Sequence, residues 1–97
     1  MRIDKLLWLL RLTRTRSLAQ ALVADGHVRR NGVRVMRASQ DVAAGDTLTL
    51  PLPGEVRVIE VLALPLRRGP AAEAQASYRA LDPQGKPALA ATSRPIA

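Results

Sequence analysis

The dipeptide Asn31-Gly32 constrains the fold of this chain more than any other short segment does. It separates two strand-like runs, residues 27–30 and 33–36, in which apolar and basic side chains alternate. Asn-Gly favours the type I′ turn of a β-hairpin, because both residues tolerate a positive φ. Because a two-residue turn fixes the register, the predicted cross-strand pairs are Arg30 with Val33, Arg29 with Arg34, and Val28 with Val35.

In this register Arg29 and Arg34 lie opposite each other on the outer face, and Val28 and Val35 face the core. Like charges directly opposite each other destabilise a hairpin, although a solvated pair loses little. Two adjacent guanidiniums can also clamp an anion, and we expect them close to the basic loop at residues 13–16. We therefore interpret the pair as functional rather than as a solvated surface.

A first helix is predicted over residues 3–12. Its apolar residues Ile3, Leu6, Leu7 and Leu10 recur at the spacing of one buried helical face. We interpret Trp8 as a partly buried packing residue rather than as a platform for stacking bases.

A second helix is predicted over residues 17–25 and ends at Gly26. Ser17 and Gln20 fit a capping box, and Leu18, Ala21 and Leu22 are expected to form its apolar face. The basic and hydroxyl side chains at residues 14–17 would place phosphate-binding groups at the positive end of this helix.

The rest of the chain reads as a small, mostly antiparallel sheet followed by a weak helix. A turn at Gly45-Asp46 precedes a strand at 47–50, whose Leu48 and Leu50 point inward, and a turn at 51–54 precedes a strand at 56–64. Gly69-Pro70 starts a short helix that carries Glu73 in its first turn and extends to Tyr78 and Leu81. The fold class is therefore α+β, with one domain at 1–66, a short helical extension at 67–81 and a flexible tail at 82–97.

The charge is concentrated at one end of the sequence. Residues 1–37 hold nine basic and two acidic residues, whereas residues 38–97 hold six of each, so the whole net charge of +7 belongs to the first segment. A field of this kind indicates a polyanionic partner, most simply a nucleic acid.

Catalytic and cofactor chemistry is not expected. The chain of 97 residues has no Cys and one His, His27, which leaves no donor set for a metal, and it contains no phosphate-cradling glycine motif. No apolar run is long enough to span a bilayer, so we expect a soluble, cytoplasmic protein with no membrane partner and no cofactor. With one Trp, one Tyr and no Phe, recognition of folded RNA is favoured over base stacking on single strands.

Several motifs together resemble the S4 RNA-binding domain, named for a protein of the small ribosomal subunit. They are Arg2-x-Asp4-Lys5-x-Leu7-Trp8, Arg11, Thr15-Arg16-Ser17-x-Ala19, Gly26-x-Val28-x-x-Asn31-Gly32 and Gly45-Asp46, within roughly residues 2–50. Arg67-Arg68-Gly69-Pro70-Ala71-x-Glu73-Ala74 and Tyr78 are similar to the segment that follows this domain in the fifteen-kilodalton ribosome-associated heat-shock proteins of bacteria.

The resemblance implies a fold in which two helices and a hairpin share one RNA-binding face. It implies binding to ribosomal RNA on the large subunit, with tRNA as a further partner, and a role in heat shock or in rescue of stalled nascent chains. We expect the chain to be a monomer. The RNA-contacting positions carried over are Lys5, Arg11, Arg14, Thr15, Arg16, Ser17, Gln20, Arg29, Arg30, Asn31 and Arg34. Asn31 is expected to matter more for the turn than for RNA. Members of that family usually continue into a basic tail, whereas residues 82–97 are nearly neutral, so we expect the first 37 residues to supply most of the affinity.

Two other classes of function remain open from the sequence. The chain could be a DNA-binding regulator that uses its second helix for recognition, although Gln20 alone could read bases there. It could instead be a protein-binding adaptor that uses the apolar strand at Val56–Leu64 together with Tyr78.

Overall fold

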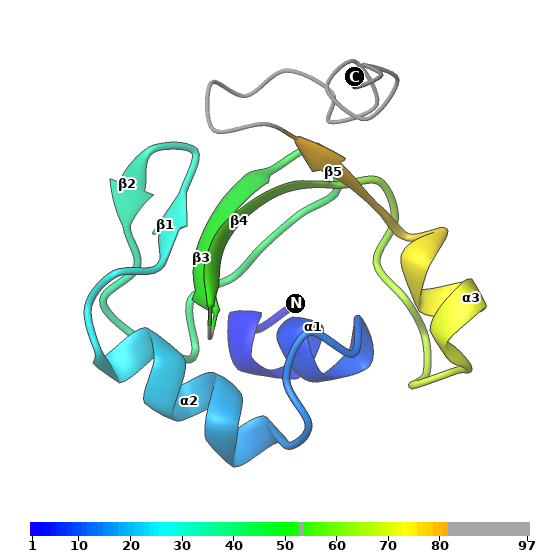
Figure 1. The fold of residues 1–97 in the computed structure, drawn as a ribbon, viewed down its shortest axis with the longest axis horizontal. Coiled ribbons are helices and arrows are strands. Elements are labelled where there is room, and N and C mark those ends of the chain that lie inside the picture. The colour runs from blue at the N-terminus through cyan, green and yellow to red at the C-terminus, as the bar shows by residue number, and fades with distance from the viewer. Residues whose placement is uncertain (53, 82–97) are drawn as a thin grey trace.

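The structure, a computed structural model, describes residues 1–52 and 54–81 (Figure 1). Its elements follow the order α1 (Ile3–Leu9), α2 (Arg16–Ala24), β1 (Arg29–Arg30), β2 (Val33–Arg34), β3 (Thr47–Leu52), β4 (Glu55–Val61), α3 (Ala71–Gln75) and β5 (Tyr78–Leu81). The predicted α+β class is confirmed. The tail predicted at 82–97 lies outside the described residues.

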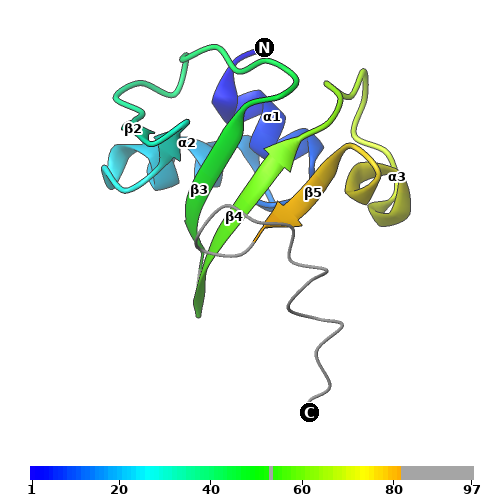
Figure 2. The same cartoon turned by 90° about the horizontal axis from the view of Figure 1, so that it is seen from above.

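Five strands form one sheet in the order β2-β1-β3-β4-β5, and every neighbouring pair is antiparallel. Helices α1 and α2 pack against one face of this curved sheet, and α3 lies beside its β5 edge (Figures 1 and 2). The core between these layers combines the apolar stripe of α1 with the inward residues of β3 and β4. Its fully buried members are Ile3, Leu6, Leu7, Leu10, Val28, Val42, Leu48, Leu50, Ile59 and Val61.

The Asn31-Gly32 hairpin forms in the predicted register. The two turn residues have φ of 51° and 83°, and Arg29 pairs with Arg34 across the turn. The predicted pair of Val28 and Val35 is buried, and the backbone N–H of Val35 donates to the carbonyl of Val28 at 2.8 Å. The local turn chemistry was therefore sufficient to predict the register of the hairpin.

Helix α1 ends at Leu9 rather than at the predicted residue 12. Arg11 adopts the left-handed conformation with φ of 59°, and its N–H donates to the carbonyl of Trp8 at 3.1 Å. The N–H of Leu12 donates to the carbonyl of Leu7 at 3.0 Å, which completes a Schellman motif. A glycine normally occupies the left-handed position of this motif. Because Arg11 stands there instead, the sequence did not indicate the motif.

Helix α2 begins at Arg16, one residue earlier than predicted. Its cap is Thr15, whose Oγ1 accepts from the N–H of Leu18 at 3.1 Å, so the predicted capping box of Ser17 and Gln20 is wrong. Gly26 ends the helix as predicted, with φ of 84°.

The buried face of α2 also differs from the prediction. Ala19 and Val23 enter the core, whereas Leu18 is 51% exposed and, with Ala21 and Leu22, lines an open apolar groove. The face of α2 that packs on the core therefore carries the small Ala19, and Leu18 lies on the exposed side.

The prediction that the helix after Pro70 extends to Tyr78 and Leu81 is wrong. Helix α3 spans only five residues after Pro70, with Glu73 in its first turn as expected, and Tyr78–Leu81 instead forms strand β5 on the edge of the sheet. Tyr78 pairs with Val61 of β4. The strand predicted at 56–64 ends at Val61, and β3 continues through the expected turn to Leu52.

We expect Asn31→Ala to lower the free energy of unfolding by about 2–3 kcal/mol, measured by urea denaturation. The alanine loses two side-chain hydrogen bonds and must still adopt a positive φ. Asn31→Gly is the matched control, because it loses the same bonds without the backbone strain and should cost less. Equal losses in the two variants would contradict the role of the backbone conformation.

Candidate nucleic-acid interface

A buried carboxylate, Asp4 on α1, organises the N-terminal part of the molecule. Its side chain is fully buried and accepts hydrogen bonds from Arg2 at 3.1 and 3.2 Å, from Gln20 at 3.0 Å and from Arg16 at 3.4 Å. The backbone N–H of Lys5 donates to the same group at 2.7 Å. One side chain thus joins the start of α1 to the first turns of α2.

The pKa of Asp4 lies below its ordinary value. Burial by itself raises the pKa of this carboxyl, but the hydrogen bonds from Gln20, Arg2, the Lys5 N–H and Arg16 together outweigh burial. The carboxylate therefore stays ionised. Within the described part of the chain, Arg16 and Gln20, both predicted RNA contacts, bind Asp4 with their side chains.

The N-terminal end of α2 presents the hydroxyl and basic groups predicted there. Arg14, Thr15 and Ser17 are exposed, and Thr15 caps the helix while the hydroxyl of Thr13 donates to the Thr15 carbonyl at 3.0 Å. The first N–H groups of a helix carry a partial positive charge that favours anions. Arg14 adds a full charge beside them, and it has no ion-pair partner among residues 1–52 and 54–81.

A second acidic residue, Asp46, holds the hairpin. Its carboxylate accepts from Arg30 at 2.7 Å, from the Asn31 side chain at 3.1 Å and from the N–H of Ala43 at 2.8 Å. The side-chain oxygen of Asn31 also accepts from the N–H of Thr47 at 2.8 Å. Arg30 and Asn31 thus turn toward the protein, in agreement with the expectation that Asn31 serves the turn.

The pKa of Asp46 is also lowered. Burial raises the pKa, but the Ala43 N–H and the side chains of Arg30 and Asn31 stabilise the ionised form more strongly. The two buried carboxylates of the described residues are thus both held charged by basic partners.

The remaining predicted cations face solvent. Lys5, Arg14, Arg29 and Arg34 are exposed, and none of the four has a carboxylate partner within the described ranges. Arg29 makes one bond, from Nη1 to the carbonyl of Gly32 at 3.3 Å. Arg37, which was not among the predicted contacts, is also exposed, and its place just after the hairpin arginines in a basic run was the available signal.

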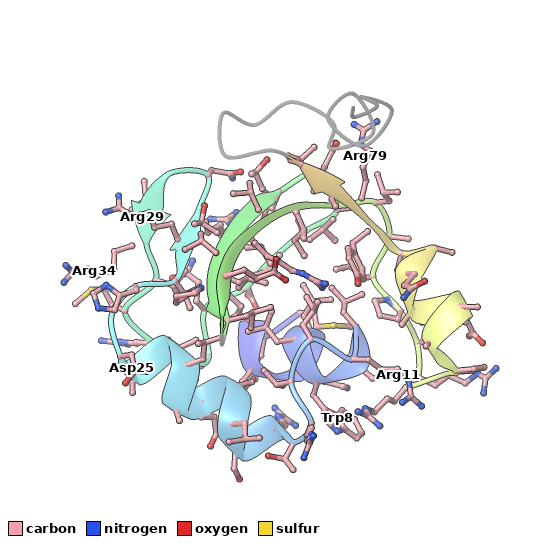
Figure 3. The ribbon with its side chains drawn as sticks, in the orientation of Figure 1. Trp8, Arg11, Asp25, Arg29, Arg34 and Arg79 are labelled. Carbon is pink, nitrogen blue, oxygen red and sulfur yellow. The ribbon has the colours of Figure 1, made fainter. Side chains whose placement is uncertain are left out.

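These cations do not form the single close cluster that was expected. Arg29 and Arg34 project from the hairpin, which follows the C-terminal end of α2 near Asp25 (Figure 3). Arg14 precedes the other end of this nine-residue helix. Since a helix rises 1.5 Å per residue, about 13 Å of helix separates the two groups. The spacing suits contacts to separate phosphates better than one shared anion clamp.

Arg11 has a different setting from the other predicted contacts. Its Nε donates to the carbonyl of Gly69 at 2.6 Å, which joins the end of α1 to the segment before α3. Trp8 is half-buried on α1, as predicted for a packing residue.

The described residues hold no group of three or more side chains that could bind a metal ion. Among those same residues, no helix is both long and apolar enough to cross a membrane.

Comparison with known proteins identifies relatives of the chain. A family model described as the S4 domain matches residues 1–48. The heat shock protein 15 homolog of Haemophilus influenzae is 38% identical over 78 residues, which are 80% of this chain and 59% of that protein. Heat shock protein 15 of Escherichia coli K12 is 39% identical over 77 residues, 79% of this chain and 57% of that protein. The chain therefore spans less than two thirds of the length of these curated relatives.

A solved structure resembles the whole chain. The trimeric structure of Vibrio cholerae heat shock protein 15 superposes with a TM-score of 0.80 at 33% identity. The alignment covers 100% of this chain and 98% of that one.

The lowered pKa values of Asp4 and Asp46 predict acid sensitivity. A carboxyl whose pKa is lower in the folded state contributes stability that is complete above its unfolded pKa and is lost as the pH falls through its folded pKa. The ordinary value is 3.8, so urea denaturation should give a nearly constant free energy of unfolding from about pH 7 to about pH 5 and a decline below about pH 4.

Asp4→Asn tests the assignment to this group. It should lower stability at neutral pH by about 1–3 kcal/mol, because it removes the charge from several hydrogen bonds, and it should also flatten the acid decline. Asp25→Asn, at an exposed position on the opposite end of α2, is the control and should change stability little. An acid decline of unchanged size in Asp4→Asn would contradict the role of Asp4.

Proposed function

The chain belongs to the heat shock protein 15 family of S4-domain proteins, and on this premise we propose that it is a non-catalytic RNA-binding protein. We propose further that it recognises structured ribosomal RNA on the large ribosomal subunit. The choice of ribosomal RNA and of the large subunit is based on the sequence resemblance and not on the geometry of the site.

The observation that carries the proposal is the set of exposed cations without carboxylate partners. Among the described residues they occur on α1, between α1 and α2, and on or just after the hairpin, as Lys5, Arg11, Arg14, Arg29, Arg34 and Arg37. Cationic groups at the two ends of α2, about one helix length apart, suit the repeating phosphates of a folded RNA. Phosphate contacts of this kind recognise shape rather than sequence.

The proposed biological role is based on the relatives and on the sequence resemblance. The names of the relatives support a role in heat shock, and the resemblance favours rescue of large subunits that carry stalled nascent chains, with tRNA as a further partner and a cytoplasmic location. The sequence predicts a monomer, whereas the Vibrio cholerae relative is described as a trimer, so the oligomeric state of this chain stays a prediction.

The two alternative functions are less well supported. A DNA-binding regulator would need α2 to read bases, but the amide of Gln20 donates to Asp4. A protein-binding adaptor would use β4, which is paired on both edges by β3 and β5. Val56 and Leu62 near its ends are 63% and 46% exposed, and they are the remaining basis for that alternative.

We expect the double variant Arg29→Ala/Arg34→Ala to weaken binding to large-subunit ribosomal RNA by about tenfold or more, because each lost phosphate contact removes a favourable electrostatic term. Filter binding at fixed salt measures the change. Thermal stability should stay the same or rise slightly, since the two like charges lie directly opposite each other.

The matched control is Arg57→Ala/Arg79→Ala, which removes the same charge from β4 and β5. Both arginines pair with surface carboxylates, Glu55 and Glu60, and Arg79 lies across the molecule from α1 and α2 (Figure 3). If both double variants weaken binding equally, net charge alone drives association and the hairpin is not the contact surface.

The number of phosphate contacts can be measured from salt dependence. With about five contacts, the logarithm of affinity should fall with the logarithm of salt concentration at a slope of about −4 to −5. Large ribosomal subunits sedimented from lysate should carry the protein at low salt and release it at high salt. A slope near zero, or free migration at every salt concentration, would contradict RNA binding.

A further inference from the structure

Two arginines, Arg11 and Arg68, are bound to backbone carbonyls instead of carboxylates. Nε of Arg11 donates to the carbonyl of Gly69 at 2.6 Å, and Nε of Arg68 donates to the carbonyl of Trp8 at 3.0 Å. Neither has an ion-pair partner in the described ranges, and no bond from their Nη groups is found there. A carbonyl fixes a guanidinium in place without neutralising it, so both keep their full charge.

The position of Arg68 is fixed by a second contact. Its guanidinium carbon lies 5.3 Å from the centre of the Trp8 ring, within the range of a cation–π interaction. The Trp8 carbonyl that it binds is at the C-terminal end of α1, where the helix carries partial negative charge. The indole thus holds an arginine, which agrees with a packing role for Trp8.

Two further basic residues are close to this contact along the chain. Lys5 is exposed and precedes Trp8 by three residues on α1, which places the two on neighbouring positions of one helix face. The side chain of Arg67 is 71% exposed, and its partner Glu73 is itself half-exposed. We call these five residues, Lys5, Trp8, Arg11, Arg67 and Arg68, the Trp8 patch.

The Trp8 patch lies away from the hairpin. Trp8 and Arg11 are on the opposite side of the molecule from Arg29 and Arg34 (Figure 3). The patch also draws on the part of the sequence whose net charge is zero. Residues 38–97 contribute Arg67 and Arg68, and the long-range bonds between positions 8 and 68 and between positions 11 and 69 hold this segment against the C-terminal end of α1.

We propose that the Trp8 patch is a second RNA contact site, in which Arg68 joins the expected contacts Lys5 and Arg11 and the Nη groups of Arg11 and Arg68 bind phosphates of the RNA backbone. The inference rests on the proposed RNA-binding function. A guanidinium presents a planar fork that matches two phosphate oxygens. Because both side chains are already held at Nε, they lose little conformational freedom when RNA binds.

The variant Arg68→Lys distinguishes the contribution of the guanidinium geometry to RNA affinity from that of the positive charge. It keeps the charge but loses the Nε bond and the planar fork, so affinity for large-subunit ribosomal RNA should fall by about three- to tenfold with an unchanged salt slope. Arg68→Ala should also make the slope shallower by about one. Arg79→Ala, which removes one surface-paired arginine from β5, is the control and should change affinity less than about twofold.

Trp8 is the only tryptophan of the chain and supplies an independent signal. Titration with ribosomal RNA should change its fluorescence emission in the wild type, and the change should be smaller in Arg68→Lys at matched saturation. Circular dichroism melting identifies any variant that has lost its fold, and Arg68→Lys is the deciding variant if Arg68→Ala does not fold.

The results of these experiments distinguish failure of the second contact site from failure of the proposed RNA-binding function. If the wild type binds RNA with no change in Trp8 emission, and both Arg68 variants bind like Arg79→Ala, the second site is overturned and the proposed function stands. If the wild type binds no RNA, both fall. Loss of affinity in Arg68→Lys but not in Arg79→Ala, with the emission change, supports the site.

Discussion

The buried carboxylate of Asp4 is the interaction on which the helical half of the molecule depends. A fully buried charge is tolerated only where opposite charges and hydrogen-bond donors surround it. Asp4 meets this condition by drawing Arg2 from before α1 and Arg16 and Gln20 from α2. The requirement fixes how the two helices meet, and so it places Thr15 at the start of α2 and Ala19 in the core.

The same two acidic residues, Asp4 and Asp46, decide which cations are available to a ligand. Ion pairing does not change the net charge of +7, so the long-range field expected from the sequence persists. It does change which guanidiniums are free to bind a phosphate. Arg16 and Arg30 are committed to carboxylates, whereas Arg11 and Arg68 are held by carbonyls and keep their charge. The chain therefore has more basic residues than it has basic side chains available to bind a phosphate.

Short-range rules predicted the features that depend on neighbouring residues. The hairpin register, the inward Leu48 and Leu50, and the end of α2 at Gly26 all follow from turn chemistry and periodicity. The misplaced cap of α2 was a local error, since Thr15 bonds to Leu18, but other errors occurred where a distant residue decides the outcome. Arg11 ends α1 in a conformation that its sequence gives no reason to expect, and its side chain bonds to Gly69. Tyr78 continued a helical pattern but pairs with β4 instead.

Sequence reasoning likewise predicted only those parts of the candidate site that depend on neighbouring residues. Exposed charges on the hairpin could be identified from alternation alone, but the partners of Gln20 and Arg30 are sixteen residues away and required the fold. The resemblance to the S4 domain identified the region without distinguishing exposed cations from those that bind internal carboxylates.

The two-residue strand β2 has a consequence for self-association. An edge strand exposes unpaired backbone groups that can nucleate intermolecular sheets, and Val33 and Met36 beside this edge are 70% and 73% exposed. The strand is too short to template a partner strand, and Arg34 and Arg37 repel a second copy of the same edge. The positive charge that we assign to RNA contact therefore also disfavours pairing of two copies along the β2 edge while no RNA is bound.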